Sequence, residues 1–454
     1  MPAKHLHKQF SKAFPGLVPW VIWVFAILFY MYQVILRISA SVFADDWVTT
    51  YGIGMNELGM LSGVFYYAYG GMQISSGRLM DKWGVRKMLT FAALMCAFGS
   101  YIMALAPTYT IAMIGRFCVG VGSSCGYLGC LKIATLWFSP RQTGLIVGLS
   151  FSFGMIGGVL GNTPLALLNQ HMHWQDIQMY FVWVGIGIAG LVWVGIRSPN
   201  KHDLITKLRT RTAPARATPT KKKNTSLVHS LMIIAKTPQA WVMAICGMLM
   251  YVPIAAFTDL WGISYFQTTL GISETEASAI NSLTFLGIVC SGPIYAMLSN
   301  HLRSHKKTMR ISAVCLCFAF GGILIAPILP STLVGFLSFL FGFFFGGEIL
   351  CYVAVVSLFS RSISGLASGF TNTVVNLSGI IFQPLVGYIL AALIEGSTPT
   401  SSTYQIALLP VFGCIVLSVV LTFFMIETFP PKKKIAESRH HTIAETQNPD
   451  KSKL

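Results

Sequence analysis

An arginine interrupts the apolar stretch YMYQVILRISASVF, residues 30–43. Intervals of three and four residues place a polar stripe on one helical face here: Tyr30, Gln33, Arg37 and Ser41. Because a guanidinium forms paired hydrogen bonds with carboxylates and phosphates, the stripe could bind an organic anion. The alternative is a structural arginine, bonded to the backbone or to the acidic pair Asp45 and Asp46 that follows it.

Two more cations stand in apolar runs. Arg116 shares a helical face with Tyr127, so it could line a transport path or assist proton release, or it could hydrogen-bond a neighbouring helix. Lys132 lies five residues before Trp137, near the inner end of the same run. It could contact an anion, or it could extend its ammonium group to the membrane surface at little cost. Arg116 is therefore a candidate for proton coupling, and Tyr127 and Lys132 are candidates for substrate binding.

Carboxyl groups also occur at membrane depth. Glu348 lies in the middle of the run GFFFGGEILCY, where burial disfavours the charged form, so it could carry a proton. It could instead pair permanently with one of the three cations. Asp259 is a second proton-coupling candidate, although gating at the outer mouth or helix capping is the favoured alternative. Tyr352 follows Glu348 by one helical turn, where it could position that carboxyl or stack on a ligand.

A row of amides marks another apolar run. Asn372, Asn376 and Gln383 recur at helical spacing and so share one face. Amides inside a membrane more often join helices than bind a substrate. We therefore expect these three residues to pack helices together.

The composition indicates an integral membrane protein. The chain has 454 residues, of which 54% are hydrophobic and only 10% charged, whereas soluble domains are nearer 25% charged. All 10 cysteines lie in apolar runs, without zinc-ligand spacing or a disulfide framework. We find no nucleophile–base pair or metal cluster at membrane depth, so we expect neither an enzyme nor a cofactor.

Hydropathy predicts an all-α membrane protein with twelve transmembrane helices. The predicted spans are 18–43, 56–77, 88–106, 109–136, 143–167, 177–196, 240–263, 275–299, 310–329, 332–357, 366–393 and 403–427. An even number of spans places both termini on the same side. The distribution of charge then identifies that side: 29 of the 32 lysines and arginines fall in the termini and in alternate loops, and the opposite loops have none.

This asymmetry predicts cytoplasmic termini, in what we expect to be the inner cell membrane. It also explains the net charge of +17 without a nucleic-acid partner. We expect a cytoplasmic N-terminus (1–17), a six-helix half (18–196), a basic linker (197–239), a second half (240–427) and a cytoplasmic tail (428–454).

The two halves repeat each other. FSPRQTGLIVG at 138–148 aligns without gaps with FSRSISGLASG at 359–369, an offset of 221 residues, and Gly158 and Gly379 continue the register. Duplicated six-helix halves related by an axis along the membrane normal are a transporter architecture, with the substrate site near the midplane between them.

The loop GRLMDKWGVRK carries a recognisable pattern: Gly77, Asp81, Lys82, Gly84, Arg86 and Lys87. It resembles the signature loop of the major facilitator superfamily, and RFCVGVG at 116–122 is similar to that family's fourth-helix pattern. We expect the loop to act as a conformational latch, with Asp81 capping a helix or pairing with a cation such as Arg141. In the second half Asn300 replaces the aspartate, which weakens a charge-based latch there.

The resemblance implies that the first, fourth, seventh and tenth helices line a central cavity. Arg37 and the segment TDLWG at 258–262 resemble the organic-anion and sugar-phosphate branches. Residues 66–84 and 368–387 resemble a bacterial branch related to lysosomal dipeptide carriers and to importers of carboxylate siderophores.

These features predict a monomeric, proton-coupled symporter for a small organic anion or zwitterion. Three membrane cations against two carboxyls would leave a net positive cavity. Alternatives are an amino-acid or dipeptide carrier, a proton antiporter that exports drugs or siderophores, and a sensor that binds a solute without transporting it.

Overall fold

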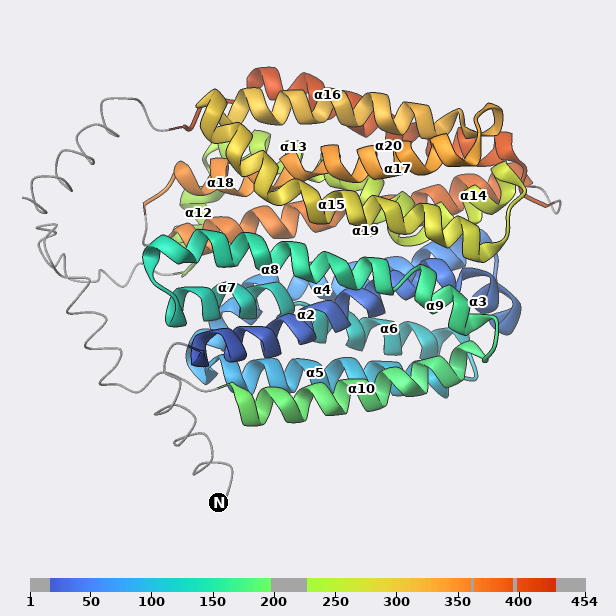
Figure 1. Ribbon diagram of the computed structural model, residues 1–454, viewed down its shortest axis with the longest axis horizontal. Coiled ribbons are helices and arrows are strands. Elements are labelled where there is room, and N and C mark those ends of the chain that lie inside the picture. The colour runs from blue at the N-terminus through green and yellow to red at the C-terminus, as the bar shows by residue number, and fades with distance from the viewer. Residues whose placement is uncertain (1–16, 197–226, 361–362, 395–397, 430–454) are drawn as a thin grey trace, which may run out of the picture.

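The computed structural model describes residues 17–196, 227–360, 363–394 and 398–429, and within them it is a bundle of helices arranged as two halves (Figure 1). Eleven of its helices are long and apolar enough to span a membrane within these ranges. The remaining long helix, α4, has 29 residues (Met55–Trp83) and includes more glycine and polar side chains. With α4 included, the bundle has the twelve predicted membrane helices in its described part.

The first half is built from helices that alternate in direction. Its elements are α2 (Val18–Val42), α3 (Ala44–Tyr51), α4, α5 (Val85–Ala104), α6 (Tyr109–Ser123), α7 (Gly126–Trp137), α8 (Pro140–Leu160), α9 (Thr163–Asn169) and α10 (Trp174–Gly195). Helices α6 and α7 together form the fourth span, and α8 and α9 form the fifth.

The second half repeats this order. Its elements are α13 (Pro238–Val252), η1 (Pro253–Trp261), α14 (Gly262–Leu270), α15 (Glu274–Leu302), α16 (His305–Leu324), η2 (Ala326–Ile328), α17 (Ser331–Phe345), η3 (Gly346–Glu348), α18 (Ile349–Ser357), α19 (Ser364–Ile394) and α20 (Ser401–Phe424). The seventh span runs through η1, a π-helical segment, and the tenth runs through the short 3-10 turn η3.

One part of the predicted linker is ordered. Residues Leu227–Ala235, which we expected to belong to the basic linker, form helix α12. The sequence LVHSLMIIA is almost entirely apolar, so it gains more from packing on the bundle than from solvation. Residues 197–226 of the linker lie outside the described ranges.

Local sequence accounts for the helix ends near the site. Ser273 accepts a hydrogen bond from the backbone N–H of Glu276 and caps α15. Pro238 and Pro140 occupy first turns, where a missing N–H costs nothing. Gly84, at φ 85°, makes the tight turn between α4 and α5 that a residue with a side chain would strain.

The repeat is visible in the helix breaks. The fourth span is interrupted between α6 and α7, at Ser124 and Cys125, and the tenth at Gly346–Glu348. An offset of 221 residues maps the second break onto residues 125–127. The fourth and tenth spans are therefore interrupted at equivalent positions of the repeat.

Two equivalent contacts close the halves together on the outer side. Gly158 of α8 leaves no room for a side chain against the ring of Phe285 on α15. Its repeat partner Gly379 of α19 packs in the same way against the ring of Tyr66 on α4. Tight packing of small residues is how helices approach closely in a membrane.

The same interface separates toward the cytoplasm. Four glycines lie on one face of α4: Gly59, Gly63, Gly70 and Gly77. A Cβ atom would lie 2.6 Å from Gln383 O at Gly59, 3.3 Å from Pro384 at Gly63 and 3.4 Å from Asn376 at Gly70, and would meet nothing within 4 Å at Gly77. Helices α4 and α19 thus pack most closely at their outer ends and less closely toward their inner ends.

Replacing Gly59 by alanine is expected to loosen the closed outer side, because the methyl group would meet backbone atoms of α19 that cannot move aside. Overpacking of this kind costs about 1–3 kcal/mol. Hydrogen–deuterium exchange should be faster at the outer ends of α4 and α19 in Gly59→Ala. The matched control is Gly71→Ala on the same helix, where a Cβ meets nothing within 4 Å. Equal exchange in both variants would contradict this account of the interface.

Candidate functional site

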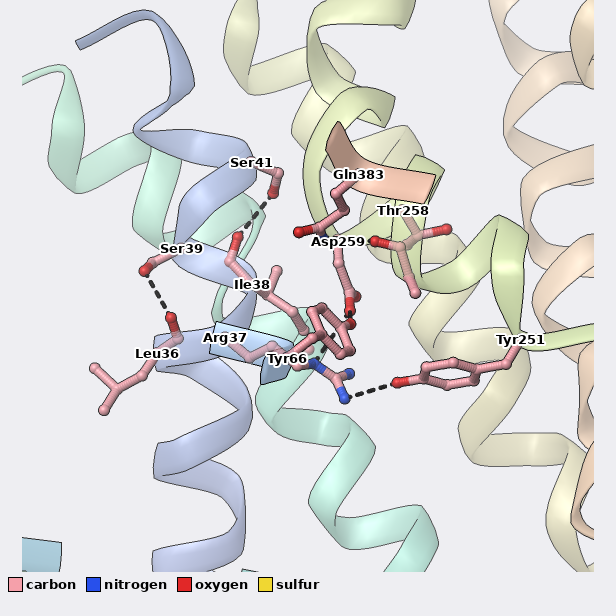
Figure 2. Close-up of polar contacts among 12 residues, drawn as sticks. Leu36, Arg37, Ile38, Ser39, Ser41, Tyr66, Tyr251, Thr258, Asp259 and Gln383 are labelled. Atoms are coloured by element: carbon pink, nitrogen blue, oxygen red, sulfur yellow. Dashed lines mark hydrogen bonds and ion pairs between the residues drawn. The ribbon is translucent and has the colours of Figure 1, made fainter. Parts of the chain in front are cut away.

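A buried ion pair joins the two halves at the closed outer side (Figure 2). Arg37 Nε of α2 lies 3.2 Å from Asp259 Oδ2 of η1, and Arg37 Nη1 donates a 3.0 Å hydrogen bond to the hydroxyl of Tyr251 on α13. The hydroxyl of Tyr66 on α4 donates to the same Asp259 oxygen. Four helical segments, two from each half, therefore meet at one guanidinium and one carboxylate.

The internal repeat explains why these residues meet. An offset of 221 maps Arg37 onto Thr258, the neighbour of Asp259, and maps Tyr30 onto Tyr251. Equivalent positions in two halves related by a twofold axis lie at the same depth on opposite sides of that axis. Arg37 and Asp259 face each other for this reason.

The sequence identified Arg37 and Asp259 separately but did not predict their pairing. The structural alternative of bonding to Asp45 or Asp46 is wrong for this conformation: Asp46 instead accepts a 2.8 Å hydrogen bond from Asn169. The alternative pairing of Glu348 with a cation is also not observed among the described residues, whose ion pairs are Arg37–Asp259 and Lys132–Asp81.

Because the Arg37–Asp259 pair is desolvated, the stability of the protein depends strongly on keeping both partners. Asp259 is completely buried and Arg37 is only 8% exposed. Taking both charges out of water costs several kcal/mol per ion, and the ion pair with its two tyrosine hydrogen bonds offsets that cost. The π-helical segment η1 carries Asp259 at this point, and π-helical turns frequently occur at functional sites.

Arg116 holds the backbone of α2 at the position of Arg37. Its two terminal nitrogens donate to the carbonyl oxygens of Leu36, at 2.6 Å, and Arg37, at 2.7 Å. The guanidinium also lies 5.5 Å from the ring centre of Trp47 and 5.3 Å from that of Phe65. This geometry matches the structural alternative for Arg116, since the side chain holds the backbone of α2 where Arg37 projects.

Lys132 lies at the cytoplasmic latch loop. Its ammonium pairs with Asp81, and their side chains are 38% and 63% exposed. We expected Lys132 to contact the substrate and Asp81 to pair with a cation such as Arg141, whose side chain lies outside the described residues. An exposed pair contributes about 0–1 kcal/mol, so this contact can form and break during a transport cycle.

The remaining residues of the predicted latch lie at the ends of α4 and α5. Gly84 makes the turn after α4, and Arg86 stacks 4.1 Å from the ring centre of Trp193. Lys82 lies in the last turn of α4, and Lys87 lies in the first turn of α5. The structure thus places the motif at the inner ends of α4, α5 and α7.

An aromatic layer lies between the Arg37 pair and the cytoplasm. The rings of Tyr30 and Tyr127 are 5.6 Å apart, and Gln33 packs beside Gly126. Across from them, the Tyr352 hydroxyl donates a 2.9 Å hydrogen bond to Asn372. Residues from α2, α7, α18 and α19 therefore form this layer, which we call the tyrosine layer.

Glu348 belongs to the tyrosine layer and is 4% exposed. Its carboxyl accepts a hydrogen bond from the Cys351 thiol at 3.7 Å, and Tyr352 follows it by one helical turn. Glu348 is the last residue of η3, the 3-10 turn that interrupts the tenth span.

The predicted packing amides lie within the second half. Gln383 donates to Ala255 O at 2.7 Å and so ties α19 to η1. Asn376 donates to Asn372 on its own helix. Sequence reasoning missed the corresponding contact between halves, in which Asn281 donates to Asn162 at 2.8 Å. The offset of 221 equates Asn162 with Gln383 and could have indicated it.

A family model described as Major Facilitator Superfamily matches residues 20–384. The chain belongs to the Major Facilitator Superfamily. It is therefore a multi-pass membrane transporter, which confirms the predicted family and fold class and the expectation that it is not an enzyme.

Full-length similarity to other members is low. The chain is 21% identical to the probable sulfoacetate transporter SauU of Cupriavidus necator, over 91% of this chain and 96% of that protein. It is 24% identical to the membrane sensor protein UhpC of Salmonella typhimurium, over 82% and 84%. A crystal structure of a bacterial homologue of the human lysosomal transporter Spinster, inward-facing and unoccupied, superposes with a TM-score of 0.70 at 14% identity, covering 90% of this chain and 97% of that one.

Removing one partner of the buried pair is expected to destabilise this transporter far more than removing both. Asp259→Leu strands a buried guanidinium, at a cost of about 3–5 kcal/mol, whereas Arg37→Leu with Asp259→Leu leaves an apolar contact. Thermal unfolding of the purified protein should therefore show a recovered melting temperature in the double variant. Additive losses would contradict direct coupling between the two side chains.

Proposed function

We propose that this protein is a secondary transporter that imports a small, carboxylate-bearing organic solute together with a proton. The observation that carries the proposal is the buried Arg37–Asp259 pair at the meeting point of the halves. A guanidinium placed there can hold either the carboxylate of Asp259 or the carboxylate of a solute. The Arg37–Asp259 pair can therefore hold the halves together when it forms and leave Arg37 able to bind the solute when it breaks.

Replacing Asp259 by a solute carboxylate on Arg37 requires protonation of Asp259. A solute carboxylate and an ionised Asp259 would place two negative charges on one guanidinium in a site of low dielectric, which is unfavourable. Oδ1 of Asp259 is buried without a hydrogen-bond partner among the described residues, so it is free to take the proton. Protonation releases Arg37 to the solute.

Closure of the outer side reverses the exchange. When Asp259 gives up its proton toward the cytoplasm, it pairs with Arg37 again, and the observed Arg37–Asp259 ion pair supports this step. The solute then loses its main charged contact and leaves toward the cytoplasm. This order of events favours import over export, and it separates the proposal from the antiporter alternative.

The relatives support a solute of this class. SauU carries the name of a sulfoacetate transporter, and its similarity covers nearly the whole chain. The name of UhpC, a membrane sensor protein, supports the sensor alternative. We favour a transporter because the chain belongs to a transporter family and its halves pack closely on the outer side, as one state of alternating access requires. We further propose a monomer in the cytoplasmic membrane.

Replacing Asp259 is expected to uncouple transport from protons. In proteoliposomes, native protein should accumulate solute when the outside is more acidic. A lower outer pH favours protonation of Asp259, and protonated Asp259 releases Arg37. Asp259→Asn should lose this pH-driven accumulation by at least about tenfold while it keeps exchange of labelled for unlabelled solute, because an amide cannot recapture Arg37 by charge.

Arg37→Ala should lose both accumulation and exchange. Asp176→Asn, which removes an exposed outer carboxylate of α10, is the matched control and should behave as native protein does. Retained accumulation in Asp259→Asn would exclude it as the proton site. Solute binding by the native protein without any exchange would identify a sensor.

A further inference from the structure

We propose that Asn281 is a positioning residue for Asp259, and that it links closure of the outer side, through Asn162 of the first half, to the π-helical segment η1. Breaking the Asn162–Asn281 contact then weakens the hold of Arg37 on Asp259 and favours protonation of that carboxyl. This inference rests on the proposed function, because it concerns how the same proton site responds when the halves separate.

Two hydrogen bonds of one buried amide carry the proposal. Asn281 Nδ2 of α15 donates to Asn162 Oδ1 at 2.8 Å and to the carbonyl oxygen of Thr258 at 2.9 Å. Asn162 lies between α8 and α9, and its own Nδ2 donates to Gly158 O at 2.7 Å, which fixes the direction of its Oδ1. Thr258 directly precedes Asp259 on η1. The Asn281 amide therefore connects the first half to the backbone that carries the proton site.

The segment η1 needs support from outside its own helix. A π-helix is rare and is mostly limited to a single turn, whereas η1 spans nine buried residues, Pro253–Trp261. Two amide side chains donate to its carbonyl oxygens, Gln383 to Ala255 and Asn281 to Thr258. The Gln383 bond lies within the second half and can persist when the halves separate. Asn281 is also bonded to the first half, so its position depends on whether the outer side is closed.

The two equivalent helix crossings differ at this position. At the α8–α15 crossing, Asn281 stands four residues before Phe285. At the equivalent α4–α19 crossing, Ser62 stands four residues before Tyr66, and its hydroxyl has no hydrogen-bond partner within the described ranges. Close packing of the halves therefore does not require an amide here. The amide occurs at the crossing from which it reaches η1.

The surroundings of Asn281 indicate that its N–H groups are what the site uses. The side chain is completely buried, and its Oδ1 has no donor in the described part of the chain. A buried acceptor without a donor is costly. The amide fits only because residue 262 is glycine, where a Cβ atom would lie 2.8 Å from Asn281 Oδ1. An amide kept at this cost is consistent with a role for its two bonds to Asn162 and Thr258.

The direction of the effect follows from the charges at the pair. Titratable and charged side chains reach Asp259 or its partner from α2 (Arg37), α4 (Tyr66), α13 (Tyr251) and α6 (Arg116). Arg37 stabilises the ionised form of Asp259, so poorer alignment of the two raises the pH at which Asp259 takes up a proton. Because coupling is reciprocal, protonation of Asp259 in turn favours separation of the halves.

The test titrates Asp259 in purified, full-length protein, with the proton as the only ligand. Infrared difference spectra against pH show the stretching band of a protonated carboxyl group, and the band that Asp259→Asn removes belongs to Asp259. Asn281→Ala should move the midpoint of that band upward by at least about half a pH unit, a roughly threefold change in proton affinity. Asn162→Ala should move it in the same direction, because it removes the anchor of Asn281 in the first half.

The matched control is Ser282→Ala. Ser282 forms a 2.8 Å hydrogen bond with Thr163 across the same crossing, and neither of its hydrogen bonds in the described structure goes to η1. Ser282→Ala should therefore keep the native midpoint. An equal shift in Ser282→Ala would overturn the inference, since general loosening of the interface would then explain it.

An unchanged midpoint in Asn281→Ala and Asn162→Ala would also overturn the inference. If Asn281→Ala does not fold, Asn162→Ala decides the question, because it leaves the Asn281–Thr258 bond in place and acts on η1 through Asn281. A band that titrates but that neither variant moves refutes this inference alone. Absence at every pH of a band that Asp259→Asn removes would refute the proton site of the proposed function, and this inference with it.

Discussion

A single desolvated ion pair organises this transporter. Arg37 and Asp259 come from opposite halves and are almost completely buried. Arg116 fixes the α2 backbone behind the arginine, while Tyr66 and Tyr251 supply the hydrogen bonds that make burial tolerable. The glycine contacts between α4 and α19 allow the helices to approach closely enough for the pair to form. The same Arg37–Asp259 pair therefore joins the halves on the outer side and neutralises the charge of Arg37.

The packing between α4 and α19 is closer at the outer end of the interface than at the inner end. Close glycine contacts at the outer end give way to open space at Gly77, beside the exposed Lys132–Asp81 pair. Strong contacts outside and weak contacts inside let the halves rock about the middle of the bundle without unfolding. The tyrosine layer lies between these two ends.

Much of the fold could be predicted from the sequence, because hydropathy, loop charge and repeats are local or one-dimensional signals. Arg37, Asp259 and Glu348 were recognisable as charges at membrane depth. Their partners were not, because partnership depends on how two halves dock and on the π-helical segment that sets the direction of Asp259. Lys132 was predicted to bind the substrate for the same reason. Its distance from Asp81 depends on how the ends of three helices pack together and cannot be read from one helix alone.

The central claim, that a solute carboxylate replaces a protonated Asp259 on Arg37, is tested most directly by counting protons during binding. Calorimetric titration in buffers of different ionisation enthalpy gives the number of protons taken up per solute bound. The account predicts uptake of about one proton by the native protein near neutral pH and none by Asp259→Asn. Equal proton uptake in both proteins, or none in either, would contradict it.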